Sequence, residues 1–111
     1  MTDKFVVMVT CGSRAEARRI ARRLVGQRLA ACVNVIPAAV ESVYRWKGKV
    51  EFGKEFLLVV KTSRARFAKL QQEIVRLHSY EVPEILALPI ARGSRTYLEW
   101  LADSVGRVKK S

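Results

Sequence analysis

Few residues of this chain could hold a metal ion or perform nucleophilic chemistry. The chain contains two cysteines, Cys11 and Cys32, and a single histidine, His78. Cys11 follows a predicted strand and precedes a helix capped by Ser13, so its sulfur should lie near backbone N–H groups and the positive helix end. That position favours the thiolate, which binds soft metals. Cys32 is expected in the middle of a strand, where burial would keep its thiol neutral and unreactive.

His78 is expected at the C-terminal end of a helix, and its role has three interpretations. A histidine there commonly interacts with free backbone carbonyl groups. It could instead bind a metal together with Cys11, or act as the base of a cysteine–histidine nucleophile pair. No third group that would orient such a pair is evident. Whether His78 reaches Cys11 depends on the topology and could require a neighbouring subunit.

The usual catalytic motifs are missing from the sequence. It has no G-x-S-x-G elbow, no Walker loop, no G-x-G-x-x-G and no H-E-x-x-H. A single histidine cannot act as a general base and also complete a set of metal ligands. Neither cysteine belongs to a CxxC pair. We therefore expect a protein that is not an enzyme and whose two thiols are free.

The formal net charge of +11 raises the question of a nucleic-acid partner. Much of the charge lies on one predicted helix face, opposed only by Glu16: Arg14, Arg18, Arg19, Arg22, Arg23 and Arg28. A solvated surface is the simplest interpretation, since a basic helix alone lacks groups that read bases. The segment 50–56 also lacks the aromatic spacing with which RNA-recognition strands stack bases. We therefore expect no nucleic-acid partner.

Length and hydrophobicity predict one soluble domain over residues 1–111. Half of the residues are hydrophobic and evenly distributed, so a core can form. No stretch approaches the roughly 20 apolar residues of a membrane helix. The first apolar run is also too short for a signal peptide. The protein should be cytoplasmic.

Hydrophobic periodicity predicts the order β-α-β-β-α-β-α. The helix over 14–26 has a capping box, Ser13 with Glu16, and an apolar stripe with helical spacing. Proline and glycine mark breaks at Pro37, Gly48 and Gly53. The other expected segments are strands over 5–10, 30–36, 40–46, 49–62 and 84–90, a helix over 64–78, a short helix after Gly93-Ser94, and a frayed basic tail over 107–111. Two β-α-β units joined by a hairpin predict an α/β chain of the α+β sandwich type, the ferredoxin-like fold.

The central hairpin is longer than a four-stranded sheet of ordinary size requires. It should therefore project beyond the sheet, and it carries Tyr44 and Trp46 on one face. Tyr97 and Trp100 lie on the short terminal helix. Exposed aromatic residues on such peripheral elements mark contact surfaces. They could alternatively fold back over the sheet, but the length of the hairpin favours contacts within an oligomer.

Several motifs occur in the order seen in one protein family: Leu29-Ala30-Ala31-Cys32-Val33-Asn34, Tyr44-Arg45-Trp46-Lys47-Gly48-Lys49, Lys61-Thr62, His78-Ser79-Tyr80-Glu81-Val82-Pro83-Glu84-Ile85, Leu88-Pro89-Ile90 and Tyr97-Leu98-Glu99-Trp100. Over residues 5–105 the chain resembles the CutA divalent-cation tolerance proteins. The resemblance implies a ferredoxin-like fold in a homotrimer similar to the PII signalling proteins, with clefts between subunits. It also implies tolerance to divalent cations and binding of copper.

The resemblance implies a metal site as well. Cys11 matches the family's cysteine after the first strand, and His78 matches the histidine next to its Pro-Tyr dipeptide. Leu77 and Ser79 stand where the family has a second histidine and the proline. A site of one thiolate and one imidazole should bind weakly, or prefer Cu(I) to Cu(II).

Three functional hypotheses follow. The first is a non-enzymatic trimer that responds to divalent metals and binds copper through Cys11 and His78. The second is a PII-like signalling module that binds a small anionic molecule in its inter-subunit clefts, through Trp46, Lys61, Tyr80 and Glu84 near the expected strand ends. The third, RNA binding, is the one the sequence argues against.

Overall fold

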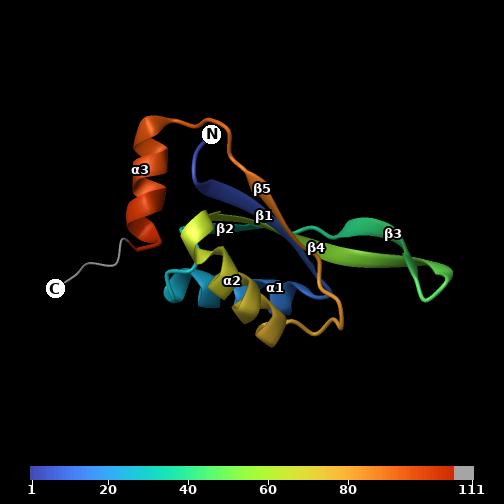
Figure 1. The fold of residues 1–111 in the computed structure, drawn as a ribbon. Coiled ribbons are helices and arrows are strands. Elements are labelled where there is room, and N and C mark those ends of the chain that lie inside the picture. Colours follow the sequence, from blue (N-terminus) through green and yellow to red (C-terminus); the bar gives the residue numbers. More distant parts are fainter. Residues whose placement is uncertain (107–111) are drawn as a thin grey trace.

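The computed structural model describes residues 1–106, and the tail predicted to fray, 107–111, lies outside the described residues. The elements follow in the predicted order (Figure 1): β1 (Lys4–Cys11), α1 (Arg14–Gly26), β2 (Cys32–Val35), β3 (Val40–Trp46), β4 (Lys49–Ser63), α2 (Arg64–Leu77), β5 (Ile85–Pro89) and α3 (Arg95–Ser104). Serine side chains cap α1 and α2, because Ser13 and Ser63 accept hydrogen bonds from the N–H groups of Glu16 and Arg66. No helix in residues 1–106 is long and apolar enough to cross a membrane.

The sheet has the strand order β2-β4-β1-β5, and all neighbouring strands are antiparallel. Both α1 and α2 lie on one face of it (Figure 1). Pro89 ends the edge strand β5, where a missing N–H costs no interior hydrogen bond. This arrangement confirms the predicted ferredoxin-like fold.

The hydrophobic core lies between the sheet and the two helices. Alternate residues of the central strands point toward the helices and are fully buried, namely Val7, Val9, Cys11, Leu58 and Val60. They meet the apolar stripes of α1 and α2, which contribute Ile20, Leu24, Leu70 and Ile74. The opposite face of the sheet is covered by neither helix. There Leu86 and Leu88 of β5 are 57% and 52% exposed.

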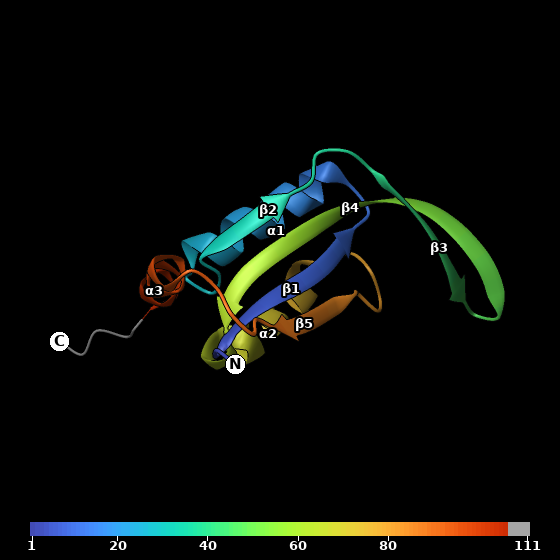
Figure 2. The ribbon, with the colours of Figure 1, turned by 90° about the horizontal axis from the view of Figure 1, so that it is seen from above.

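The hairpin projects from the sheet, as predicted (Figure 2). The second half of β4 pairs with β1, from Phe56 to Ser63, whereas its first half pairs only with β3. Lys47 and Gly48 form the turn with positive φ angles of 51° and 81°, which suits the twist of a two-residue hairpin. The predicted irregularity at Gly53 is wrong, because the register with β3 passes through it unbroken. Tyr44 packs beside Gly53, and a Cβ added there would make an ordinary van der Waals contact with its hydroxyl at 3.6 Å.

The region around β2 also differs from the prediction. The strand begins at Cys32 rather than at residue 30, because the N–H groups of Leu29 and Ala30 still donate to Leu24 at the end of α1. Cys32 is therefore the first residue of its strand and half-buried, rather than buried in the middle. The predicted break at Pro37 is confirmed. Residues 36–39 face only residues 56 and 57 of β4, which is a bulge between β2 and β3.

Candidate metal centre and the adjoining cleft

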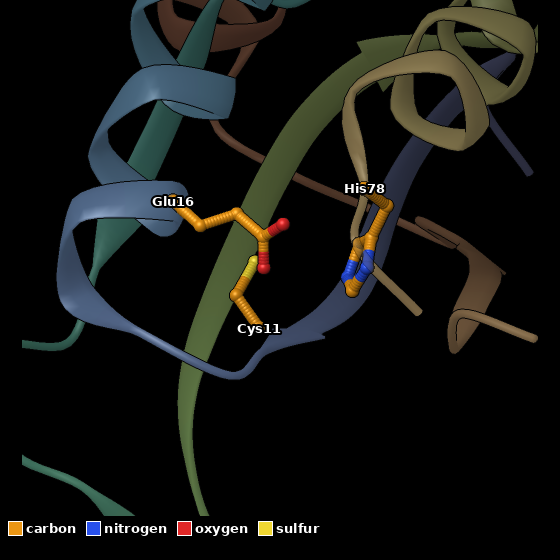
Figure 3. A group of neighbouring side chains, drawn as sticks. All are labelled: Cys11, Glu16 and His78. Atoms are coloured by element: carbon orange, nitrogen blue, oxygen red, sulfur yellow. The ribbon is translucent and has the colours of Figure 1, made fainter. Parts of the chain in front are cut away.

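Three buried side chains with metal-binding groups converge beside the start of α1. Cys11 is the last residue of β1, Glu16 lies in the first turn of α1, and His78 directly follows α2. One ligand atom from each lies within 4.8 Å of the other two (Figure 3). The fold therefore brings His78 to Cys11 within a single chain, and no neighbouring subunit is needed for this approach.

Glu16 is the member of this group that was not predicted from the sequence. The capping box was expected to direct its carboxylate back toward Ser13. Instead, both carboxylate oxygens reach across to the segment after α2. One accepts the backbone N–H of Ser79 at 2.7 Å, and the other accepts the Ser79 hydroxyl at 3.1 Å. In the sequence, only the position of Glu16 in the first helical turn, close to Cys11, could have suggested a metal ligand. A capping role accounts for a glutamate at that position equally well.

The hydrogen bonds of His78 define its protonation. Its Nδ1 accepts the backbone N–H of Tyr80 at 3.1 Å, so this nitrogen carries no proton. Its Nε2 lies 2.7 Å from the carbonyl oxygen of Thr10 and must donate to it. The ring is therefore the neutral Nε2–H tautomer, the form that binds metals through Nδ1. The carbonyl that it contacts belongs to β1 rather than to its own helix.

Cys11 is a thiol and not the thiolate predicted from its position. Burial raises the pKa of Cys11 to about 12, and the negative charges of Glu16 and Glu55 add to the effect. The side chain has no exposed surface. Desolvation and two neighbouring carboxylates thus outweigh the helix dipole, which contributes only about 0.3–1 kcal/mol at an exposed site.

A thiolate, a carboxylate and an imidazole form a donor set for soft or borderline metals such as copper or zinc. The residues fit such an ion chemically, but each is already engaged. Metal binding must displace the thiol proton of Cys11 and the N–H of Tyr80 from His78 Nδ1. The group is less suited to nucleophilic catalysis, because Cys11 is enclosed and His78 directs its proton to Thr10.

A cleft of about 550 Å³ adjoins the group on the side of the hairpin. It lies between the hairpin and the segment after α2. Its lining consists of Thr10, Ser42, Val43, Tyr44, Trp46, Glu55, Tyr80, Glu81, Val82 and Glu84. Three of the four residues assigned to a small-molecule site therefore meet here, namely Trp46, Tyr80 and Glu84. Glu55 and Glu81 were not predicted as part of a site.

Lys61 is not brought to this cleft. It lies further along β4, paired in register with Val6 and with Cys32, and its ammonium group contacts Asn34. Six residues of extended strand separate it from Glu55, a distance of roughly 20 Å.

Tyr80 connects the cleft to the metal-ligand group. Its backbone N–H donates to His78, and its hydroxyl donates to Glu55 Oε2 at 2.9 Å. Burial and this bond to a carboxylate raise the pKa of Tyr80. Gly12 permits the approach, because an added Cβ would lie only 3.2 Å from the Tyr80 ring.

The fold and the buried ligand group define the class of protein: a small ferredoxin-like α+β domain with an extended hairpin and a candidate cation site. The family model described as "CutA1 divalent ion tolerance protein" matches residues 5–104. The chain belongs to this family.

Individual relatives agree with this assignment. The chain is 52% identical over 101 residues to the divalent-cation tolerance protein CutA of Thermus thermophilus, covering 91% of this chain and 97% of that protein. A solved structure of a divalent cation tolerance protein from the same species superposes with a TM-score of 0.90 at 50% identity, over 93% of this chain and 99% of that one. The structure named "Periplasmic divalent cation tolerance protein CutA" from Archaeoglobus fulgidus has a TM-score of 0.89 at 40% identity, over 93% and 99% of the two chains.

A relative from Arabidopsis thaliana is longer. The chain is 46% identical over 99 residues to "Protein CutA, chloroplastic", covering 89% of this chain but 54% of that protein. The names of relatives thus contain both "periplasmic" and "chloroplastic". The cytoplasmic location of this chain stays a prediction.

Proposed function

We propose that this chain is a non-enzymatic homotrimeric protein of divalent-cation tolerance that binds copper through Cys11 and His78. The observation that carries the proposal is the convergence of these two side chains with Glu16 inside one chain, with ligand atoms within 4.8 Å of one another. Glu16 adds a third donor to the two expected from the sequence. The names of the family and of its relatives refer to divalent-cation tolerance and to no enzyme.

Copper titration of the reduced protein tests the metal site. Cu(I) would be supplied without oxygen in competition with a chromophoric chelator, and folding would be checked by circular dichroism. We expect Cys11→Ala to weaken binding by more than about tenfold, because the softest donor is lost. Cys32→Ala is the matched control and should bind as the wild type does. Equal affinity and stoichiometry in Cys11→Ala and wild type would remove Cys11 from the site.

Varying the pH gives a second readout of the same titration. A metal bound by Cys11 must displace the thiol proton, since the pKa of about 12 keeps the free thiol protonated. Apparent copper affinity should therefore rise about tenfold per pH unit between pH 7 and pH 9. An affinity that does not change over this range would show that the thiol is not a ligand.

The trimer is proposed from the surfaces that one chain leaves exposed. Val43 and Phe52 of the hairpin are 65% and 77% exposed, and neither helix covers the sheet face that carries Leu88. Tyr97 and Trp100 on α3 are also exposed and lie against each other at 5.4 Å between ring centroids. Apolar surface of this kind favours association.

Light scattering during size-exclusion chromatography tests the trimer, which should have the mass of three chains. Leu88→Arg should dissociate it by placing charge on the uncovered sheet face. Val75→Arg, on an exposed position of α2, is the matched control and should leave the mass unchanged. A monomeric wild type would contradict the proposal.

A second candidate is a PII-like signalling module that binds a small anionic molecule in clefts between its subunits. The cleft favours it, because a volume of about 550 Å³ with aromatic walls and a few polar groups suits a small ligand. The residues expected to hold an anionic ligand were Trp46, Lys61, Tyr80 and Glu84. Thermal-shift screening of metabolites against the wild type and Lys61→Ala tests it. An anion whose stabilisation requires Lys61 would support that assignment.

A further inference from the structure

The charged residues that line the cleft are all acidic. Among its lining residues are three carboxylates, Glu55, Glu81 and Glu84, and no lysine, arginine or histidine. Glu81 and Glu84 are exposed and border the opening, whereas Glu55 is half-buried and holds the Tyr80 hydroxyl. Lys61, the cation on which an anionic ligand was to depend, contacts Asn34 instead. An anion placed here would face carboxylates without a lining cation to offset them.

Aromatic rings supply the second part of the site. Tyr44 and Trp46 of β3 line one side, and Tyr80 lines the other. The faces of such rings attract cations at distances up to about 6 Å. The chain itself illustrates this property, because the Lys47 ammonium lies 5.6 Å from the centroid of the Trp46 ring.

A threonine hydroxyl is a further polar group among the lining residues. Thr10 is only 7% exposed and lines the cleft. Its backbone carbonyl accepts from His78, so the residue borders both the cleft and the metal-ligand group. A hydroxyl can accept an N–H, which a bound amine would supply.

From these three observations we propose that the cleft binds a small organic cation, an amine or guanidine that carries an apolar group. The apolar group lies against Trp46 and Tyr44, and the charged nitrogen faces Glu84 and Glu81. This proposal rests on the second candidate function and reverses the charge expected of its ligand. It does not depend on copper binding.

Two probes of matched size and opposite charge test the proposal, benzylamine and phenylacetate. Both would be titrated into the whole protein in its native assembly, with binding followed by calorimetry and by tryptophan fluorescence. We expect benzylamine to bind at least about tenfold more tightly than phenylacetate, because the lining contains only negative charges. Phenylacetate binding as tightly as benzylamine would overturn the proposal, and so would the absence of benzylamine binding.

Charge-removing variants locate the bound cation. Glu84→Gln and Glu81→Gln should each weaken benzylamine binding by about threefold to fivefold, since exposed ion pairs contribute up to about 1 kcal/mol. Both positions are exposed, so the fold should tolerate the changes. Glu41→Gln is the matched control, because this exposed glutamate of β3 does not line the cleft. Equal losses in Glu41→Gln and Glu84→Gln would indicate general electrostatics and overturn the assignment to the cleft.

The outcomes for the two sites are separable. Cys11→Ala removes a copper ligand and should leave benzylamine affinity unchanged, whereas Glu84→Gln should leave copper affinity unchanged. Failure of benzylamine to bind, with copper binding intact, rejects the cleft proposal alone. Failure of copper to bind, with benzylamine binding intact, rejects the metal proposal alone.

Discussion

The metal-ligand group and the cleft lie next to each other, yet they differ in accessibility. Cys11 has no exposed surface, and both Glu16 and His78 use their hydrogen-bonding groups to hold the loop after α2. In the cleft, by contrast, Tyr44 and Trp46 are 46% and 39% exposed. A metal must therefore break existing bonds, whereas a cleft ligand adds to free surfaces. The buried group stabilises the fold even without an ion, whereas the aromatic lining of the cleft keeps exposed surface.

The largest expected effect concerns the metal-ligand group: its Cys11 thiol should make the free energy of unfolding depend on pH. The folded pKa of Cys11, about 12, lies above its ordinary value of 9.0, so the folded state retains the thiol proton longer than the unfolded state. The resulting stability is fully present below pH 9 and is lost as the pH rises toward 12. The loss is on the order of 1.4 kcal/mol per pH unit in this window.

Urea unfolding of the metal-free protein between pH 8 and pH 11 measures this slope. Cys11→Ala should have a smaller slope than the wild type, whatever its stability at neutral pH. Cys32→Ala is the matched cysteine control, because it leaves Cys11 and its two neighbouring carboxylates in place. Indistinguishable slopes in the three proteins would contradict the assignment to Cys11.

The next largest difference is expected between the stability costs of removing two glutamates, Glu16 from the metal-ligand group and Glu84 from the cleft. Glu16→Ala should lower the free energy of unfolding by about 2 kcal/mol, because two hydrogen bonds to a charged acceptor are lost. Glu84→Ala should change it by less than about 0.5 kcal/mol, as is usual for an exposed position. Denaturant unfolding gives both values. Similar costs at the two positions would remove the distinction between a structural and an available carboxylate.

A smaller loss of stability is expected on changing Tyr80, which contacts both the metal-ligand group and the cleft. Tyr80→Phe removes the bond to Glu55 and should destabilise the fold by about 1 kcal/mol. Tyr44→Phe is the control, because it leaves that bond in place. Thermal unfolding followed by circular dichroism would detect the difference. A change in Tyr44→Phe as large as in Tyr80→Phe would assign the effect to the cleft as a whole.

The smallest effect is expected at Gly12. An added Cβ would lie 3.2 Å from the Tyr80 ring, so the ring must move by a few tenths of an ångström. Because Gly12 is exposed, Gly12→Ala should change the free energy of unfolding by no more than about 0.5 kcal/mol, but it should shift the tryptophan fluorescence of the cleft. Gly26→Ala is the control, because no atom lies within 4 Å of its added Cβ. An unchanged Gly12→Ala spectrum would show that the ring position does not influence Trp46.

The fold was predictable from the sequence because its signals are local and repeated. The apolar stripe and the Ser13 cap of α1, the proline at residue 37 and the Lys47-Gly48 turn each predicted a feature that the structure contains. The prediction was wrong where one residue type allowed two outcomes. Gly53 was expected to mark an irregularity, but the strand pairing with β3 continues through it.

The candidate sites were predictable only in part. Cys11 and His78 were identified because cysteine and histidine are rare in this chain and carry distinctive chemistry. The state of Cys11 was predicted wrongly, because a helix start is visible in the sequence, whereas burial and the charges of Glu16 and Glu55 are not. Lys61 was grouped with Trp46 from its place near a strand end. Within one chain the two lie far apart along the sheet, and their meeting between subunits stays a prediction.

The sequence by itself thus determined the order and type of the elements, the core faces and two of the three candidate metal ligands, Cys11 and His78. Spacing and residue type suffice for these features, since both act over a few neighbouring positions. Only the tertiary structure decided that Glu16 joins Cys11 and His78 and that the cleft beside them is lined with carboxylates. Those properties depend on which side chains distant in the sequence come into contact, and on how far that packing removes them from water.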